Sequence, residues 1–224
     1  MDSAGLLLIG VGCVGLFLVA VIAGAVVARR KERERVERIR QWAGAAGWRL
    51  EVRPQVEWGR RMPGRNRRGV SLAVSGQLDG RPVTAAEYSY TTTTSTGTNG
   101  TSSTTTYHYV ILVVGMRGVW PVVAVHRRGK LSRFGRALFG DRATAVGYKP
   151  FDRDYRVTAD DPARVRGVLG RDLIAAHAAG RLPQWSLGGR ELLTFREGRI
   201  VQPEALPAEL APLVRVADLI EPPR

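Results

Sequence analysis

The chain has 224 residues and a formal net charge of +14 at pH 7, and its single cysteine is Cys13. One cysteine so near the N-terminus excludes disulfides, a cysteine nucleophile and a cysteine-ligated zinc site from the rest of the chain. About 195 residues follow the first apolar segment, which is enough for one domain with its own core.

The apolar segment, residues 5–28, contains no charged residue. At about 1.5 Å of rise per residue, a helix of this length crosses a hydrocarbon core of about 30 Å. A cleaved export signal would need a basic start, whereas Asp2 precedes this segment, although "AGA" and "VVA" near its end keep cleavage as an alternative. We therefore expect residues 1–28 to be a short outer N-terminus and an uncut transmembrane helix, a signal anchor.

A dense basic flank follows the apolar segment. Cytoplasmic loops are enriched in Lys and Arg, so this flank predicts a single-pass protein of the cell membrane with its N-terminus outside and its C-terminal domain cytoplasmic. Anionic lipid head groups attract such cations, and no other partner is needed to explain them. The candidate lipid-binding residues are Arg29, Arg30, Lys31, Arg33 and Arg35.

Two glycine patterns lie inside the apolar segment. Gly10, Gly12 and Gly15 spell G-x-G-x-x-G, but no strand precedes them, so we expect no dinucleotide site. A ridge of small residues at i, i+4 and i+8 would let two helices approach closely, which makes a homodimer a hypothesis. The ridge consists of Ala20, Gly24 and Ala28.

The positive charge is concentrated in two stretches. Residues 29–68 carry a net charge of +9 and residues 126–142 carry +5, while the positive and negative charges of the remaining residues cancel. Nucleic acid is the rival acceptor for such cations, but we find no recognition-helix or stacking signature, so lipid is favoured over nucleic acid. The second basic patch consists of Arg127, Arg128, Lys130, Arg133 and Arg136.

After the apolar segment, residues 29–48 are predicted to form a basic juxtamembrane helix, because apolar residues recur there at helical spacing. The rest, residues 49–224, is predicted to be a cytoplasmic α+β domain. It begins with an extended "WRLEV" at residues 48–52. A surface loop follows over residues 53–69, which are rich in Pro, Gly and Arg.

Residues 70–116 are predicted to form β structure. Asp79-Gly80 is typical of a type I′ turn between two strands. The Thr-rich segment that follows is nearly palindromic, so we predict a long polar ribbon that closes at Thr98-Asn99 or Asn99-Gly100. A buried strand then continues, and residues 119–126 supply another strand, with Pro121 near a sheet edge.

Four tyrosines flank the Thr-rich segment and fall on one face in either register of the ribbon. Aromatic side chains at the base of a protruding ribbon would suit contact with another protein. The candidate partner-contact residues are Tyr88, Tyr90, Tyr107 and Tyr109.

The C-terminal half mixes helices and strands. Apolar residues 131, 134 and 138 predict a short helix that packs on the sheet or, alternatively, rests on a membrane. A strand over residues 151–158, a helix from the Asp161-Pro162 cap to Gly180, a hairpin about Glu197-Gly198 and a last helix around Pro212 follow. This order predicts an antiparallel sheet with helices packed on one face.

No catalytic constellation is visible. His108, His126 and His177 lack metal-ligand spacing, and the acidic pairs at residues 152/154 and 160/161 suit a strand edge and a helix cap. We expect no catalytic residues, no cofactor and no metal. The expected function is a protein-interaction or scaffold module held at the inner leaflet. The alternative is a ligand-binding or enzymatic domain with a pocket near His126 and Tyr155.

The stretches "RIRQWAGAAGWRLE", "GQLDGRPVTAAEYSY", "FDRDYRVTADDPARVRGVLGRDLIAAHA" and "LAPLVRVADLIEP" cover much of the chain after the apolar segment. In pattern they resemble a family of actinobacterial, single-pass, membrane-anchored proteins of unknown function. The resemblance implies an anchor followed by a cytoplasmic domain, and it implies no activity and no site residues. The Thr-rich ribbon and the Arg-rich loop depart from the family pattern.

Overall fold

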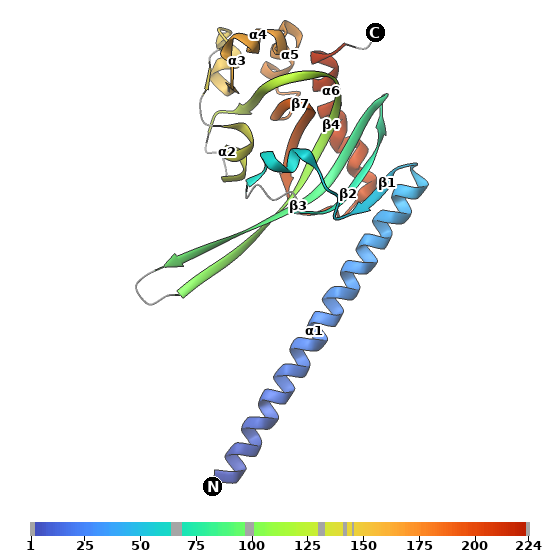
Figure 1. The fold of residues 1–224 in the computed structure, drawn as a ribbon, viewed down its shortest axis with the longest axis vertical. Helices are drawn as coiled ribbons and strands as arrows, with labels where there is room; N and C mark the ends of the chain where they lie inside the picture. Colours follow the sequence, from blue (N-terminus) through green and yellow to red (C-terminus); the bar gives the residue numbers. More distant parts are fainter. Residues whose placement is uncertain are drawn as a thin grey trace. The chain divides into compact units, whose positions relative to one another are not determined.

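The computed structural model describes residues 3–63, 69–96, 101–129, 133–140, 143–144 and 146–222 (Figure 1). Only the backbone is described for residues 3–19, 94–96, 101, 133, 143–144 and 162. The chain divides into two units, residues 1–42 and 43–224, and each is described by itself.

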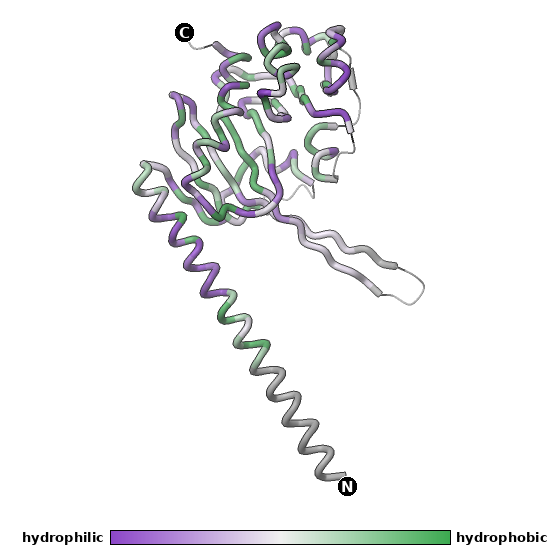
Figure 2. The backbone as a smooth tube through the Cα atoms, turned by 180° about the vertical axis from the view of Figure 1, so that it is seen from behind, coloured by the Kyte–Doolittle hydropathy of each residue, from purple (hydrophilic) through white to green (hydrophobic). Residues whose placement is uncertain are grey.

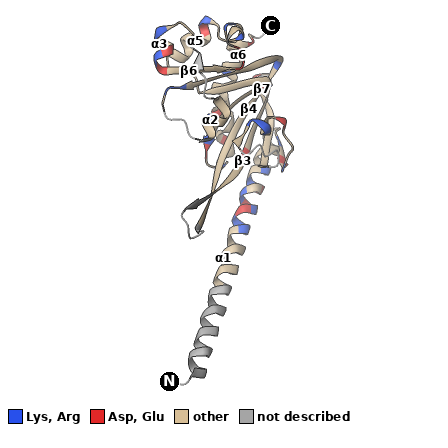
Figure 3. Cartoon of the chain, turned by 60° about the vertical axis from the view of Figure 1, so that its left-hand side comes forward, with Lys and Arg blue, Asp and Glu red and all other residues tan. Residues whose placement is uncertain are grey.

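Helix α1 (Ser3–Ala45) forms the first unit up to residue 42, and its charged part agrees with the predicted juxtamembrane helix. Lys, Arg and Glu alternate along that part (Figure 3), with Arg30 bonded to Glu34 at 3.0 Å. Among the described residues, no helix has an apolar stretch long enough to cross a membrane. The side chains of residues 5–19, most of the apolar segment, lie outside the described residues.

The described part of the second unit contains a seven-stranded antiparallel sheet. Its path is β1-β2-β3-β4-β6-β5, and β7 also pairs with β4. The strands are β1 (Arg49–Val52), β2 (Val70–Leu78), β3 (Arg81–Thr96), β4 (Thr101–Arg127), β5 (Ala143–Thr144), β6 (Tyr155–Ala159) and β7 (Trp185–Glu197).

The first hairpins form as the turn residues predict. Asp79 and Gly80 both have positive φ, at 50° and 74°, which is the requirement of a type I′ turn between β2 and β3. Strands β3 and β4 then pair from Val83↔Val114 out to Thr96↔Thr101. This register is symmetric about Thr98-Asn99, one of the two predicted registers, and residues 97–100 themselves lie outside the described residues.

Two strand predictions were wrong. Residues 119–126 are not a separate strand, because β4 continues through register shifts between Gly115 and Val123 and so passes Pro121. The predicted hairpin about Glu197-Gly198 is absent, since β7 pairs with β4 along most of its length and ends at Glu197. Gly198, with φ of 100°, turns the chain toward a helix instead of a partner strand.

Short helices connect and cover the strands. They are η1 (Glu57–Arg61), α2 (Arg133–Phe139), α3 (Lys149–Asp154), η3 (Pro162–Arg164), α4 (Val165–Val168), α5 (Arg171–Ala178), η4 (Pro203–Ala205) and α6 (Leu206–Ile220). The last agrees with the predicted C-terminal helix, and Pro212 lies inside it.

Three local predictions need correction. The predicted surface loop 53–69 contains η1, and the Trp58 side chain is buried in the core. Residues 151–154, expected to begin a strand, belong to α3. The predicted helix 162–180 is broken, because Leu169 has ψ of 80° and Gly170 is extended, so that α4 and α5 are separate.

Helices cover both faces of the sheet, which corrects the prediction that they cover one. Ala86, Ile111 and Leu193 belong to a core cluster with residues of η1 and α2. Neighbouring residues of a strand point to opposite faces, so Ala85 lies on the other face. There α6 contacts β2, β3, β4 and β7, and Figure 1 shows it behind the strands.

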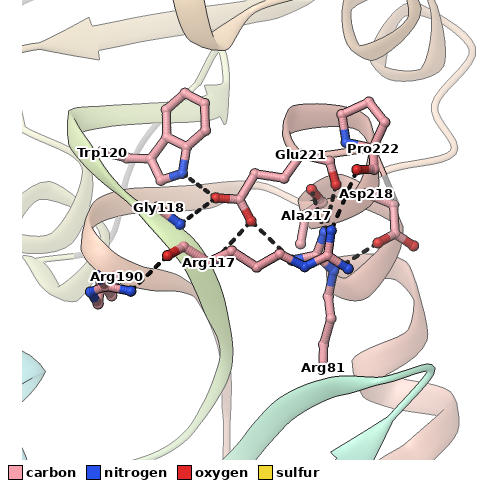
Figure 4. A network of polar contacts seen from close by, with 9 residues as sticks. All are labelled: Arg81, Arg117, Gly118, Trp120, Arg190, Ala217, Asp218, Glu221 and Pro222. Atoms are coloured by element: carbon pink, nitrogen blue, oxygen red, sulfur yellow. Dashed lines mark hydrogen bonds and ion pairs between the residues drawn. The ribbon is translucent and has the colours of Figure 1, made fainter. Parts of the chain in front are cut away.

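A buried arginine joins α6 to the sheet (Figure 4). Arg81, at the start of β3, is 1% exposed. Its Nε donates to Asp218 Oδ1 at 2.7 Å, and its Nη1 donates to Glu221 Oε2 at 3.2 Å. Its Nη2 donates to the carbonyl oxygens of Ala217 and Glu221 at 3.2 and 2.7 Å. The guanidinium therefore satisfies the C-terminal carbonyls of α6 and two carboxylates at once.

Glu221 connects the same cluster to the bend of β4. Its carboxylate accepts hydrogen bonds from the backbone N–H groups of Arg117 and Gly118 at 3.0 and 2.8 Å, and from the Trp120 indole at 2.6 Å. Burial alone would raise the pKa of Glu221, but these donors and Arg81 outweigh it and lower that pKa to about 2. The carboxylate is therefore ionised in the neutral range.

Replacing Arg81 tests this attachment. We expect Arg81→Met to lower the free energy of unfolding by about 3–5 kcal/mol, because it removes one partner of a buried, hydrogen-bonded charge cluster. The measurement is urea unfolding of the full chain in detergent, followed by circular dichroism. Arg117→Met is the matched control, with a change below about 0.5 kcal/mol, since its side chain is exposed and, within the described part of the chain, its one side-chain hydrogen bond is to the Pro222 carbonyl, at 3.4 Å. Equal losses of unfolding free energy in the two variants would contradict the role of Arg81 in attaching α6 to the sheet.

Candidate functional site

The β3–β4 hairpin extends beyond the rest of the sheet (Figure 1). Pairing of β2 with β3 ends at Tyr88, and pairing of β7 with β4 begins at Tyr109. We call residues 89–96 and 101–108 the ribbon, because their strand pairing is with each other. At its base, the Ser89 N–H also donates to the Gly69 carbonyl at 3.0 Å, and the His108 carbonyl accepts from the Gly198 N–H at 2.9 Å. Within the described part of the chain, no further strand pairs with either edge of the ribbon.

The ribbon is polar but uncharged. Residues 91–107 contain no Lys, Arg, Asp or Glu, and the hairpin is pale in Figure 2 where the core strands are green. Cross-strand hydroxyls face each other, with Thr91 and Thr106 3.0 Å apart and Thr93 and Thr104 3.5 Å apart. β-Branched Thr and such cross-strand pairs favour strand pairing in a segment that has no core beneath it.

A chain of stacked aromatic rings fastens the base of the ribbon to the domain. The ring of Tyr90 stacks on Tyr107 at 5.3 Å and on Tyr109 at 6.0 Å. Tyr109 stacks on Phe134 of α2 at 4.0 Å, and Phe134 contacts Phe195 of β7 at 4.6 Å. The rings thus lead from the core out to the exposed surface.

The four candidate tyrosines come together but differ in exposure. Tyr88 and Tyr109 are buried, and the Tyr88 hydroxyl donates to the Pro63 carbonyl at 2.5 Å. Burial, with further contributions led by neighbouring Tyr90, raises the pKa of Tyr109 far above its usual value, so it stays neutral. Tyr90 is half-buried and Tyr107 is 41% exposed, so part of each side chain is accessible to a partner protein.

Sequence reasoning did not place Phe134 and Phe195 at the ribbon. Phe134 was recognised only as an apolar residue of a short helix, and Phe195 only as part of a strand. Their approach to Tyr109 depends on the pairing of β7 with β4 and on α2 packing over that pair. Neither relation leaves a local signal in the sequence.

The second basic patch is described in part. Arg127 and Arg128 are exposed at the end of β4, and Arg136 is exposed on α2. Lys130 and the side chain of Arg133 lie outside the described residues. Phe134 and Leu138 are buried in the core cluster, which confirms that α2 packs on the sheet.

The candidate lipid-binding residues lie along α1. Arg29, Arg30, Lys31 and Arg33 are exposed, while Arg35 is half-buried and bonded to Glu32 at 2.8 Å. The small-residue ridge of Ala20, Gly24 and Ala28 is exposed on the same helix. Lipid contact and a helix–helix homodimer both remain predictions.

Three of the titratable candidates, His126, Asp152 and Asp161, make structural hydrogen bonds. His126 is buried, its Nδ1–H donates to the Arg127 carbonyl at 3.0 Å, and burial lowers its pKa. Asp161 accepts from the Ala163 N–H at 3.0 Å as a helix cap, and Asp152 accepts from two backbone N–H groups. His108 is exposed on the ribbon. Among the described residues, no cluster of three or more His, Cys, Asp or Glu could hold a metal.

No protein-family model matches the chain, and no curated protein matches it. One solved structure is similar to it, the crystal structure of the mycobacterial trehalose monomycolate transport factor A, TtfA. The two align with a TM-score of 0.48 and 16% sequence identity, over 84% of this chain and 96% of that chain. At this distance the likeness assigns neither a family nor an activity.

The aromatic chain yields a stability prediction. We expect Phe134→Ala to cost about 3–5 kcal/mol of unfolding free energy, because it empties a fully buried position between Tyr109 and Phe195. Tyr107→Ala, at the exposed end, is the control and should cost only about 1 kcal/mol. Urea unfolding measures both. A smaller loss for Phe134→Ala than for Tyr107→Ala would show that the stack does not hold the base of the ribbon.

Proposed function

We propose that this chain is a non-enzymatic, membrane-anchored binding protein whose ribbon accepts an extended segment of another protein by β-strand addition. One observation carries the proposal: beyond Ser89 and His108, both edges of the ribbon lack a strand partner in the described structure. An unpaired edge presents a row of backbone N–H and C=O groups that a partner strand can satisfy.

The ribbon also lacks the devices that usually protect an edge. Charged side chains, proline and β-bulges discourage pairing with a further strand. Residues 91–106 contain no charged residue and no proline, and the register of β3 with β4 shows no shift. Both edges are therefore geometrically regular and electrostatically neutral, as strand addition requires.

Tyr90 and Tyr107 supply a side-chain contact next to the edges. Tyrosine is enriched in interface cores because it buries much area at a small cost in side-chain entropy. Tyr107 stacks on Tyr90, which stacks on Tyr109, so these contacts orient both rings before any partner arrives. The partner strand would give backbone pairing along the ribbon, and its side chains would meet the tyrosines at the base.

Photo-crosslinking in cells tests the ribbon. A photoreactive amino acid at Thr93 or Thr104 of the full chain should give a discrete adduct with one other protein, whereas the same residue at exposed Val201 should give none. The adduct should fall severalfold in a Thr92→Lys plus Thr105→Glu variant. Its paired opposite charges preserve the ribbon and place charge on both edge strands.

Two outcomes would contradict strand addition at the ribbon. The first is an adduct yield that the charged pair leaves unchanged. The second is an adduct of twice the chain's own mass, which would assign the ribbon to a second copy of this chain. Circular dichroism of the charged variant serves as the control for folding.

Anchoring in the membrane is the second part of the proposal. It is supported by the uncharged segment 5–28 and by the continuity of α1, whose 43 residues carry the helix from that segment into the basic flank. Exposed Arg29, Arg30, Lys31 and Arg33 would lie next to the inner leaflet, where each cation contributes about 1 kcal/mol of attraction to anionic lipid.

Reporter fusions test this topology. With alkaline phosphatase or a green fluorescent protein fused after Arg224, we expect a fluorescent fusion and an inactive phosphatase, both in the membrane fraction after carbonate washing. The reason is that the basic flank holds the C-terminal domain on the cytoplasmic side. An active phosphatase with a dark fluorophore, or release by carbonate, would refute the proposed anchoring.

A further inference from the structure

A cavity lies where the end of β4 meets α3, β6 and α5, apart from the ribbon. Its volume is about 330 Å³, within the range of small-molecule sites. Pairing of Arg127 with Tyr155 across β4 and β6 brings these segments together. The cavity is lined by Arg127, Arg128, Arg153, Asp154, Tyr155, His177, Ala178 and Gly180.

The lining is rich in cations. It contains three arginines and one carboxylate, Asp154, which is bonded to Arg153 at 3.2 Å. Within the described residues, no carboxylate forms an ion pair with Arg127 or Arg128, although Arg128 Nε donates to the backbone carbonyl of Asp152 at 2.6 Å. The lining thus has a formal excess of two positive charges, with guanidinium groups from β4 and α3.

His177 adds a buried donor to this lining. Its side chain is fully buried, and its Nε2 accepts a hydrogen bond from the Trp185 indole at 2.8 Å. An indole N–H can only donate, so Nε2 carries no hydrogen and the hydrogen of the neutral ring is on Nδ1. Burial lowers the His177 pKa to about 4, which keeps the ring neutral near pH 7.

The Nδ1–H of His177 has no hydrogen-bond partner in the described structure. A buried donor without an acceptor costs about 1–3 kcal/mol, so such groups usually mark a missing acceptor. The lining has one further aromatic residue, Tyr155, whose ring lies 4.9 Å from that of His177 and stacks at 5.2 Å on Phe151, which is outside the lining. Apart from Asp154, the charged groups of the lining are arginines, which favour a ligand that carries negative charge.

We propose that this cavity binds a phosphate monoester, with the dianion between Arg127, Arg128 and Arg153 and the buried His177 ring in the wall next to it. A phosphate suits the site better than a carboxylate does, because it has more acceptor oxygens and about two negative charges. The charge excess of the lining matches that dianion, and the aromatic wall would take the ester group. The inference is independent of the ribbon and of its partner.

The test uses the full chain in detergent with its histidine rings labelled with ¹⁵N. The chain has three histidines, so the Nδ1–H resonance of His177 can be assigned by single replacements. Two probes distinguish the sources of the phosphate. Glycerol 3-phosphate represents a soluble ligand, and phosphatidic acid in the micelle, compared with phosphatidylcholine, represents a lipid head group. We expect one of them to shift the His177 Nδ1–H resonance in a saturable manner.

Matched variants control for general charge effects. Arg127→Gln plus Arg128→Gln should weaken binding at least about tenfold, which is about 1.4 kcal/mol of binding free energy, because the pair removes two of the three guanidinium groups. Arg166→Gln plus Arg171→Gln removes the same charge from exposed positions outside the cavity and should leave binding unchanged. Equal weakening by both pairs, or a His177 resonance that neither probe moves, would overturn the proposal.

Discussion

The hydrogen bonding of β4 along both of its edges is the constraint on which the rest of the domain depends. Over Tyr109–Val114 the strand pairs with β3 on one side and β7 on the other, and further on it pairs with β6 and β7. A strand held in this way can project at one end, where it forms half of the ribbon. At its other end it positions Arg127 and Arg128 at the phosphate cavity. Both proposed surfaces are therefore extensions of one element.

The bend of β4 lies where its pairing with β7 shifts register, between Gly115 and Val123. The cluster around Arg81 and Glu221 holds this part of the strand in place. Burying a guanidinium costs free energy that the carboxylates of Asp218 and Glu221 only partly return, so a hydrophobic contact could stabilise the domain as well. A charge cluster is more selective, because it requires the end of α6, the start of β3 and the bend of β4 to meet in one arrangement. We interpret Arg81 as fixing the position of α6 more than as adding net stability.

Local signals predicted the parts of this fold that depend on neighbouring residues. The Asp79-Gly80 turn and the symmetry about Thr98-Asn99 were sufficient for two hairpins and for the ribbon register. Glu197-Gly198 was also interpreted as a hairpin turn, but the residues beyond it form η4 and α6 instead of a strand. The second helical layer was missed for a similar reason, since amphipathic α6 gives no local indication of which sheet face it covers.

In the two candidate sites, too, local features could be predicted from the sequence, whereas features that depend on non-local pairing could not. The tyrosines of the ribbon could be named from the sequence because strand alternation places them on one face, but their burial could not, as it depends on Phe134 and Phe195. A pocket near Tyr155 was among the alternatives, whereas the approach of Arg153 and His177 to Arg127 needed the β4–β6 register. Cavities are formed by non-local pairing, so sequence pattern indicates their composition only after the topology is known.

The two proposed surfaces differ in the physical force that would select their ligands. The ribbon has no charge over residues 91–107 and offers mainly backbone groups, so it would recognise the extended shape of a partner strand more than its charge. The cavity lining has an excess of cations, so it would select negative charge through guanidinium groups. Because β4 joins them through the rigid middle of the sheet, occupation of one surface need not deform the other. A partner protein and a phosphate ligand could therefore bind to the same chain at the same time.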